Sequence, residues 1–204
     1  MYRDKETGLI ALTHSDIRLA RPNASLPSDL TNEIIQEVGF DMVRQAPRPN
    51  VDEIRQAVSE ADPVWSDGEW VQAWRVTDLP VEQATQNLAL ALTSKRLQIN
   101  AWRLQANRGT FTHGGKSFAC DELSRSDIDG ITSYVTLCGA LPPDWPGGWK
   151  AIDNTYLAIT TVDQWRQFVA SMVASGSANF ERSQVLKAQL ELCTTQAQID
   201  AIQW

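Results

Sequence analysis

The stretch FTHGGKSFACDE, residues 111–122, brings a histidine, a cysteine and two carboxylates together in twelve residues. Such a set could bind a metal ion, or could pair Cys120 with His113 as a nucleophile and its base. Zinc ligands in short loops come as paired Cys or His about two to five residues apart, whereas these two are seven apart. Gly114 and Gly115 instead suit a tight turn, which needs positive φ angles. We therefore expect a hairpin here, with no metal site and no catalytic site.

Other catalytic patterns are also weak. Two pairs of nearby carboxylates occur, Asp127 with Asp129 and Asp62 with Asp67, but 25 acidic residues make such pairs common by chance. Asp127 and Asp129 are two positions apart, so they point to different sides of a helix. The sequence contains no GxxxxGK[ST], GxGxxG or GxSxG motif, which argues against nucleotide-binding and α/β-hydrolase functions. We expect a protein without catalytic residues, metal or cofactor.

Composition argues against nucleic-acid and membrane partners. The net charge is −7 and the isoelectric point is near 4.8, and the 18 basic residues are scattered, whereas phosphate binding needs clustered Lys and Arg. The first residues lack the apolar region of a secretory signal, and no apolar run approaches the roughly 20 residues of a membrane span. Cys120, Cys138 and Cys193 form no CxxC pair, so we expect free, partly buried thiols in a reducing cytoplasm.

The apolar pattern predicts an α+β protein with three parts. These are a small mixed N-terminal unit with a β-hairpin (1–79), a long connecting helix (80–109) and a mostly helical C-terminal unit with two short β-hairpins (110–204). The chain also holds eight tryptophans, which suit both small cores and protein contact surfaces. We expect most of them in the core and a few in contact with a partner.

The first unit carries two local signals. Residues 27–40 predict a short helix capped by Ser28 or Asp29 and stopped by Gly39. The Asp67-Gly68 pair supplies the positive φ angles of a tight hairpin turn. The tryptophans expected on one face of this hairpin are Trp65, Trp70 and Trp74. We expect this hairpin to lie at the surface with one face packed against the core. The alternative is a platform of tryptophans that stacks sugars.

The long helix has two apolar sides. Residues 80–109 contain no internal Gly or Pro before Gly109, and span about 42 Å as a helix. One side is a heptad-like seam that Lys95 interrupts. Leu90, Leu97 and Leu104 form a second stripe with a spacing of seven residues. Because a helix with two apolar faces needs two neighbours, we expect this stripe to bind a partner chain or to join two domains.

The C-terminal unit is expected to alternate hairpins and helices. After the first hairpin, in which Phe111 and Phe118 face the core, Asp121 is a natural helix cap. The remaining elements are predicted as a helix over 121–140, a hairpin over 149–160 turning at Asp153-Asn154, and helices over 161–176, 179–193 and 195–204. Trp145 and Trp149 lie in a Pro/Gly-rich loop and are the second candidate partner-binding surface.

The order of these motifs resembles a known family. Residues 99–130 (INAWRLQANRGTFTHGGKSFACDELSRSDIDG) are followed by a Trp-containing hairpin, by TVDQWRQFVASMVA and by the closing LKAQLELCTTQAQIDAIQW. This series, over 95–204, is similar to a domain of tailed-bacteriophage tail-fibre and fibre-assembly proteins. ADPVWSDGEWVQAWRV (61–76) is similar to a hairpin of phage tail-fibre assembly proteins, which supports the same biological context.

The resemblance implies a non-enzymatic protein that binds a phage tail-fibre polypeptide, as an assembly chaperone or adaptor. It would act in the host cytoplasm during phage assembly, or stay in the virion tail. One alternative is a permanent structural subunit of the baseplate or tail fibre, which contacts baseplate proteins or self-associates through the long helix. A glycan-active enzyme that uses the tryptophan hairpin is the alternative from another class.

Overall fold

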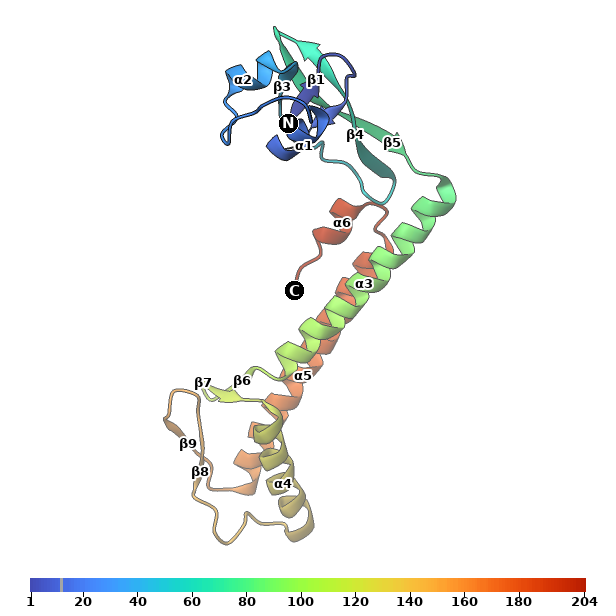
Figure 1. Cartoon of the computed structure of the whole chain (residues 1–204). Helices are drawn as coiled ribbons and strands as arrows, with labels where there is room; N and C mark the ends of the chain where they lie inside the picture. The colour runs from blue at the N-terminus through green and yellow to red at the C-terminus, as the bar shows by residue number, and fades with distance from the viewer. Residues whose placement is uncertain (12) are drawn as a thin grey trace. The chain divides into compact units, whose positions relative to one another are not determined.

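The computed structural model describes residues 1–11 and 13–204, and it confirms the α+β class with 46% helix and 22% strand. The chain divides into two compact units, Met1–Thr85 and Gln86–Trp204. Figure 1 shows the elements of both units. The division falls in the first turns of the long helix α3 (Val81–Asn107).

Unit 1 is built on a five-stranded sheet with the strand order β2-β1-β3-β5-β4. The strands are β1 (Tyr2–Asp4), β2 (Ile10–Ala11), β3 (Phe40–Arg44), β4 (Gln56–Ser66) and β5 (Glu69–Asp78). β1 pairs antiparallel with β2 and β3, and β4 pairs antiparallel with β5, while β3 and β5 run parallel. The hairpin was predicted, but the sheet in which it pairs with β3 and is joined to β1 and β2 was not.

The β4–β5 hairpin has the predicted turn. Asp67 and Gly68 have φ angles of 51° and 86°, and Trp65 lies directly opposite Trp70 in the ladder. β4 forms one edge of the sheet, and its pairing shifts register between Ala61 and Val64. The hairpin is thus regular at its turn and irregular further along the edge strand.

Two short helices complete unit 1, α1 (His14–Ala20) and α2 (Asn32–Glu37). The predicted caps of the second helix, Ser28 and Asp29, are wrong, because the hydroxyl of Thr31 accepts from the Ile34 amide. Leu30 is buried just before this cap, so the chain turns into the helix only after it. The small core of the unit consists of Ile17, Leu30, Ile35 and Phe40.

A buried ion pair joins β1 to the end of α1. Asp4 is 3% exposed, and its Oδ2 lies 2.8 Å from Nη1 of Arg21. The Arg21 guanidinium also lies over the ring of Phe40 at 4.8 Å. Hydrogen bonding from Arg21, helped by the amides of Glu6 and Thr7, lowers the pKa of Asp4 to about 2.

Unit 2 alternates helices with short hairpins, as predicted. Besides α3, its elements are β6 (Thr110–His113), β7 (Lys116–Ala119), α4 (Glu122–Cys138), β8 (Gly148–Lys150), β9 (Tyr156–Ala158), α5 (Val162–Glu191) and α6 (Gln196–Asp200). The predicted turns are confirmed by positive φ angles at Gly114, Gly115 and Asn154. The predicted cap is also confirmed, since Asp121 accepts from the Ser124 amide at 2.9 Å.

The prediction of a helix end near Gly176 is wrong, because α5 continues through this residue to Glu191. A glycine inside a helix costs roughly 1 kcal/mol relative to alanine. The continued helix buries Ser183, Leu186 and Leu190, and this packing outweighs the local cost. The last predicted helix is shorter than expected, since α6 covers only Gln196–Asp200.

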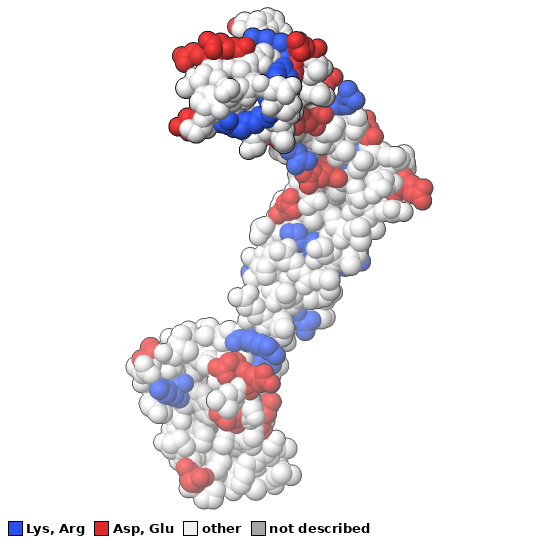
Figure 2. Space-filling view, in the orientation of Figure 1, with Lys and Arg blue, Asp and Glu red and all other residues white. Residues whose placement is uncertain are grey.

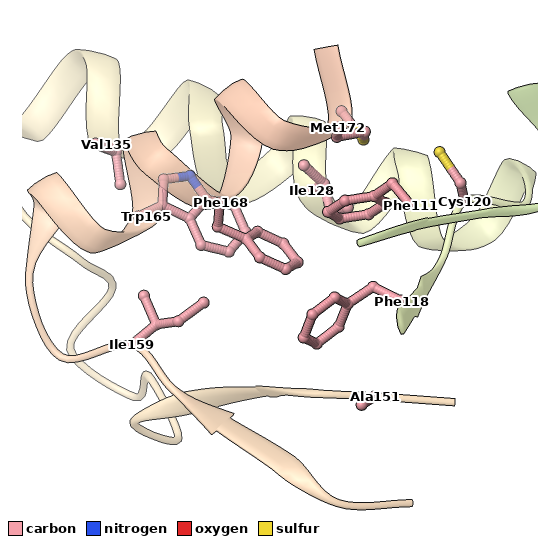
Figure 3. Packing of buried hydrophobic residues seen from close by; sticks show 10 residues of the cluster. All are labelled: Phe111, Phe118, Cys120, Ile128, Val135, Ala151, Ile159, Trp165, Phe168 and Met172. Atoms are coloured by element: carbon pink, nitrogen blue, oxygen red, sulfur yellow. The ribbon is translucent and has the colours of Figure 1, made fainter. Parts of the chain in front are cut away.

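An aromatic cluster forms the core between the hairpins, α4 and α5 (Figure 3). Phe111 and Phe118 pair across the β6–β7 ladder and both contact Phe168, with ring centroids at 5.0 and 4.9 Å. Trp165 is 1% exposed beside them. The other buried members are Cys120, Ile128, Val135, Ala151, Ile159 and Met172. Of the three thiols expected to be partly buried, Cys120 is buried and Cys193 is half-buried, whereas Cys138 is exposed.

The long helices α3 and α5 run side by side and antiparallel (Figure 1). Asn107 of α3 accepts a hydrogen bond from Asn179 of α5, and Arg96 pairs with Glu191 at the other end of the contact. We expected Lys95 to interrupt the apolar seam of α3, but its side chain is buried with this seam. It is buried because its Nζ donates to the Ile202 carbonyl at 3.2 Å, so its ammonium keeps a partner.

Candidate partner-binding surfaces

The candidate catalytic pair His113 and Cys120 is separated in the structure. His113 lies next to the β6–β7 turn, whereas Cys120 follows the opposite end of β7. Nδ1 of His113 lies 2.8 Å from Oγ of Ser171, and its ring packs edge-on against Phe168, so the imidazole is half-buried. Cys120 is buried, and its Sγ accepts from Nε of Arg125 at 3.2 Å. The thiol and the imidazole therefore have separate structural partners.

The carboxylates with shifted pKa values also have structural partners. The Ser124 amide donates to Asp121 at the start of α4 and lowers the pKa of that carboxyl. The Thr155 hydroxyl does the same for Asp153 in the β8–β9 turn. In residues 1–11 and 13–204, no three His, Cys, Asp or Glu side chains gather closely enough to hold a metal ion. Over the same residues, no helix combines the length and apolar character that crossing a bilayer requires.

Two tryptophans of the β4–β5 hairpin have partners elsewhere in unit 1. Nε1 of Trp70 donates to Asp41 at 3.1 Å, and the guanidinium of Arg3 lies 4.2 Å above the centre of its ring. Nε1 of Trp74 donates to a backbone carbonyl at 3.1 Å. Trp65 is 61% exposed. Because Arg3 covers one face of Trp70, this ring is a poor platform for stacking a sugar.

Trp145 and Trp149, the second predicted surface, lie half-buried against the core of unit 2. Their rings stack with centroids 6.1 Å apart, and each lies 5.4 Å from the ring of Trp165. Nε1 of Trp145 donates to the Ile159 carbonyl at 2.7 Å. Contacts with the core of unit 2 thus hold both rings in place. Their role in binding a partner stays a prediction.

A hollow with a volume of about 590 Å³ opens beside these two rings. Pro146, Ile152 and Tyr156 also line it, and the last two are 56% and 63% exposed. Sequence reasoning missed both residues as candidates. Alternation along the short strand after the Asp153-Asn154 turn could have indicated the outward position of Tyr156. The hollow offers a partner rigid aromatic surface with exposed apolar residues at its rim.

Leu90, Leu97 and Leu104, the first predicted surface, are 69%, 66% and 52% exposed. We call them the leucine stripe. Successive helix residues are about 100° apart, so the fully buried Ile99 lies about 180° from Leu90 around the helix. The stripe therefore points away from the packed side of α3.

Both surfaces lie in the part of the chain that a known family covers. The family described as Domain of unknown function (DUF4376) matches residues 90–203, which hold the leucine stripe and the hollow. No curated protein and no solved structure gives a significant match. The matched residues make up more than half of the sequence. The chain therefore belongs to the DUF4376 family.

Proposed function

We propose that this protein is a non-enzymatic, tail-fibre-associated protein that binds a fibre polypeptide as an assembly chaperone or adaptor. The hollow beside Trp145 and Trp149 is the observation that carries the proposal. The partner class rests on the resemblance of residues 95–204 and 61–76 to fibre and fibre-assembly proteins. The family match shows that residues 90–203 form one family domain, and the description of this family assigns no function.

The physical basis is an aromatic surface that is already rigid before binding. Trp145 and Trp149 are held by each other and by Trp165, so a partner would not have to pay for ordering them. The hollow has a volume of about 590 Å³, which suits one or two side chains of a peptide, since ligand hollows measure roughly 300–1,000 Å³. Aromatic residues in such positions contribute most of the free energy at many interfaces.

The test is co-expression of the full chain with a tail-fibre polypeptide from the same genome. Tyr156→Ser and Ile152→Ser change the rim of the hollow, and we expect each to weaken capture of the fibre about tenfold or more. Leu137→Ser is the matched control, because this residue is 85% exposed and lies outside the hollow. Fibre trimers that form equally well without the chain, or unchanged capture by both rim variants, would rule the proposal out.

The leucine stripe favours a second candidate, a permanent subunit of the baseplate or tail fibre in which α3 joins a bundle of several chains. An exposed apolar stripe of this kind suits a lasting interface better than a transient one. Mass spectrometry of purified particles separates the candidates. A chaperone is absent from the particle, whereas a subunit is present at a fixed ratio to the fibre.

A further inference from the structure

We propose that the leucine stripe binds a second copy of this chain, so that α3 self-associates as a short coiled coil. The inference goes beyond fibre binding, which we assign to the hollow, and it does not depend on it. Three features of α3 carry it: the spacing of the leucines, their position opposite the packed side of the helix, and the lack of charge around them.

The spacing of the leucines favours a helix as the partner. Leu90, Leu97 and Leu104 repeat every seven residues, and they span about 21 Å along the helix. A straight α-helix drifts by about 20° per heptad from a seven-residue repeat. A line of leucines at this spacing stays in contact with a neighbour when two helices supercoil around each other. The stripe thus supplies one of the two core positions of a coiled-coil heptad in three layers, and small or polar residues such as Ser94 and Ala101 hold the other position.

The neighbours of α3 within unit 2 leave the leucine stripe uncovered. Ile99 and Lys95, the buried residues of α3, lie on the other side of the helix, where Lys95 contacts the Ile202 carbonyl. The three leucines remain more than half exposed. A helix 27 residues long is therefore covered along one side and bare along the other.

The residues of α3 beside the leucine stripe are uncharged, and charges border it at its Leu104 end, where Arg108, Glu122, Arg125 and Asp129 line a pocket together with this leucine. The flanking positions hold Gln86, Thr93, Ser94, Asn100, Ala101 and Gln105. The nearby cations have partners elsewhere, since Arg96 pairs with Glu191 and Arg103 lies 4.8 Å over the ring of Phe180. Figure 2 shows a largely white surface over the two long helices, with a few separate blue patches.

This neutrality favours a copy of the same helix over a partner with charged flanks. Like charges beside a coiled-coil seam repel identical chains, and α3 has none at these positions. A partner with acidic or basic flanks would lose water around its charges and find no opposite charge on α3. Amide side chains both donate and accept hydrogen bonds, so the flanks of two copies complement each other. The second copy also supplies the same seven-residue repeat.

The experiment is light scattering and sedimentation of the purified full chain over a concentration series up to about 500 µM, because three leucine layers are a short seam. We expect the mass to rise to a multiple of the 22.7 kDa chain. Combined Leu90→Glu, Leu97→Glu and Leu104→Glu substitutions are expected to raise the dissociation constant more than about a hundredfold.

A control variant removes equally exposed apolar residues elsewhere in unit 2, with Leu123→Glu and Leu137→Glu, and should associate like the wild type. Circular dichroism checks that both variants are folded. A wild type that stays monomeric over the whole series overturns the proposal. So does a folded triple variant that associates as strongly as the wild type. Neither result bears on fibre capture by the hollow, because the fibre is absent from the experiment.

A cross-linking test locates the contact independently. Leu97 is the middle leucine, so it faces Leu97 of the second copy whether the helices run parallel or antiparallel. In a background with Cys138→Ser and Cys193→Ser, we expect Leu97→Cys to form a covalent dimer under mild oxidation. Leu137→Cys in the same background should not. Equal cross-linking at both positions would contradict the proposed interface.

Discussion

Each unit contains a hairpin that carries tryptophans, but the two hairpins meet different surroundings. In unit 1, Trp70 lies on a sheet, where Arg3 covers its ring and Asp41 accepts its indole hydrogen bond. In unit 2, Trp149 packs against the rings of Trp165 and Phe168. Trp70 is thus held by a charged group, a hydrogen bond and one further ring, that of Trp65, whereas Trp149 is enclosed by several aromatic rings.

The contrast extends to the two cores. Unit 1 has a small core next to the buried Asp4–Arg21 ion pair. Unit 2 has a larger cluster in which Phe111, Phe118 and Phe168 contact one another. The stability of unit 1 should therefore respond to charge and pH, and that of unit 2 to the loss of apolar volume.

The largest expected effect is in unit 2, from Trp165→Ala. This residue is 1% exposed at the centre of the aromatic cluster, so its loss leaves a cavity and should cost about 3–5 kcal/mol. Hydrogen exchange measured by mass spectrometry on the full chain reports each unit separately. Amides of unit 2 should lose protection while those of unit 1 do not. Equal loss in both units would break the comparison.

We expect low pH to destabilise unit 1 by protonating Asp4. The folded-state pKa of this carboxyl is about 2, against 3.8 ordinarily, so its contribution is complete above pH 3.8 and is lost as the pH falls through 2. The loss amounts to about 2 kcal/mol. Urea unfolding followed by NMR signals of unit 1 measures it. Asp4→Asn should abolish this part of the pH dependence, and an unchanged profile in that variant would contradict the assignment.

A smaller effect is expected from Trp70→Phe, which keeps a ring under Arg3 but removes the hydrogen bond to Asp41. We expect unit 1 to lose about 1 kcal/mol, the usual net contribution of one hydrogen bond. A double-mutant cycle with Asp41→Ala isolates this contact. Coupling close to zero would show that packing, and not polar contacts, holds the tryptophan of this hairpin.

The smallest effect is expected from Leu137→Ala, at the last turn of α4. This side chain is 85% exposed, so the stability of unit 2 should change by less than about 0.5 kcal/mol. The measurement is the same urea unfolding, followed through signals of unit 2. A cost similar to that of Trp165→Ala would mean that the aromatic cluster is not what stabilises the unit.

Local signals explain most of what the sequence predicted correctly. The turns at Asp67-Gly68 and Gly114-Gly115 need positive φ angles, and the Asp121 cap needs a side-chain acceptor, so each is determined within a few residues. The exposed leucine stripe was also predictable, because a seven-residue spacing fixes which side of a helix its members share. None of these inferences required knowledge of distant contacts.

Distant contacts explain what the sequence did not predict. The parallel pairing of β3 with β5 joins Val43 to Trp70, and no local pattern indicates it. Gly176 reads locally as a helix end, but packing of the later turns carries α5 through it. The hollow arises from Trp149 and Tyr156 on paired strands together with the preceding loop, so it exists only after folding. Periodicity alone did not show that Trp145 and Trp149 would be half-buried.

The irregular edge strand of unit 1 has a consequence for aggregation. The outer strand of a sheet offers unpaired amides and carbonyls to any strand that approaches it, and long regular edges lead molecules to aggregate. In β4 the register shift between Ala61 and Val64 places Asp62 and Pro63 at the break, and proline has no amide to donate. The β4 edge of the sheet is therefore a poor template for a strand of a neighbouring molecule.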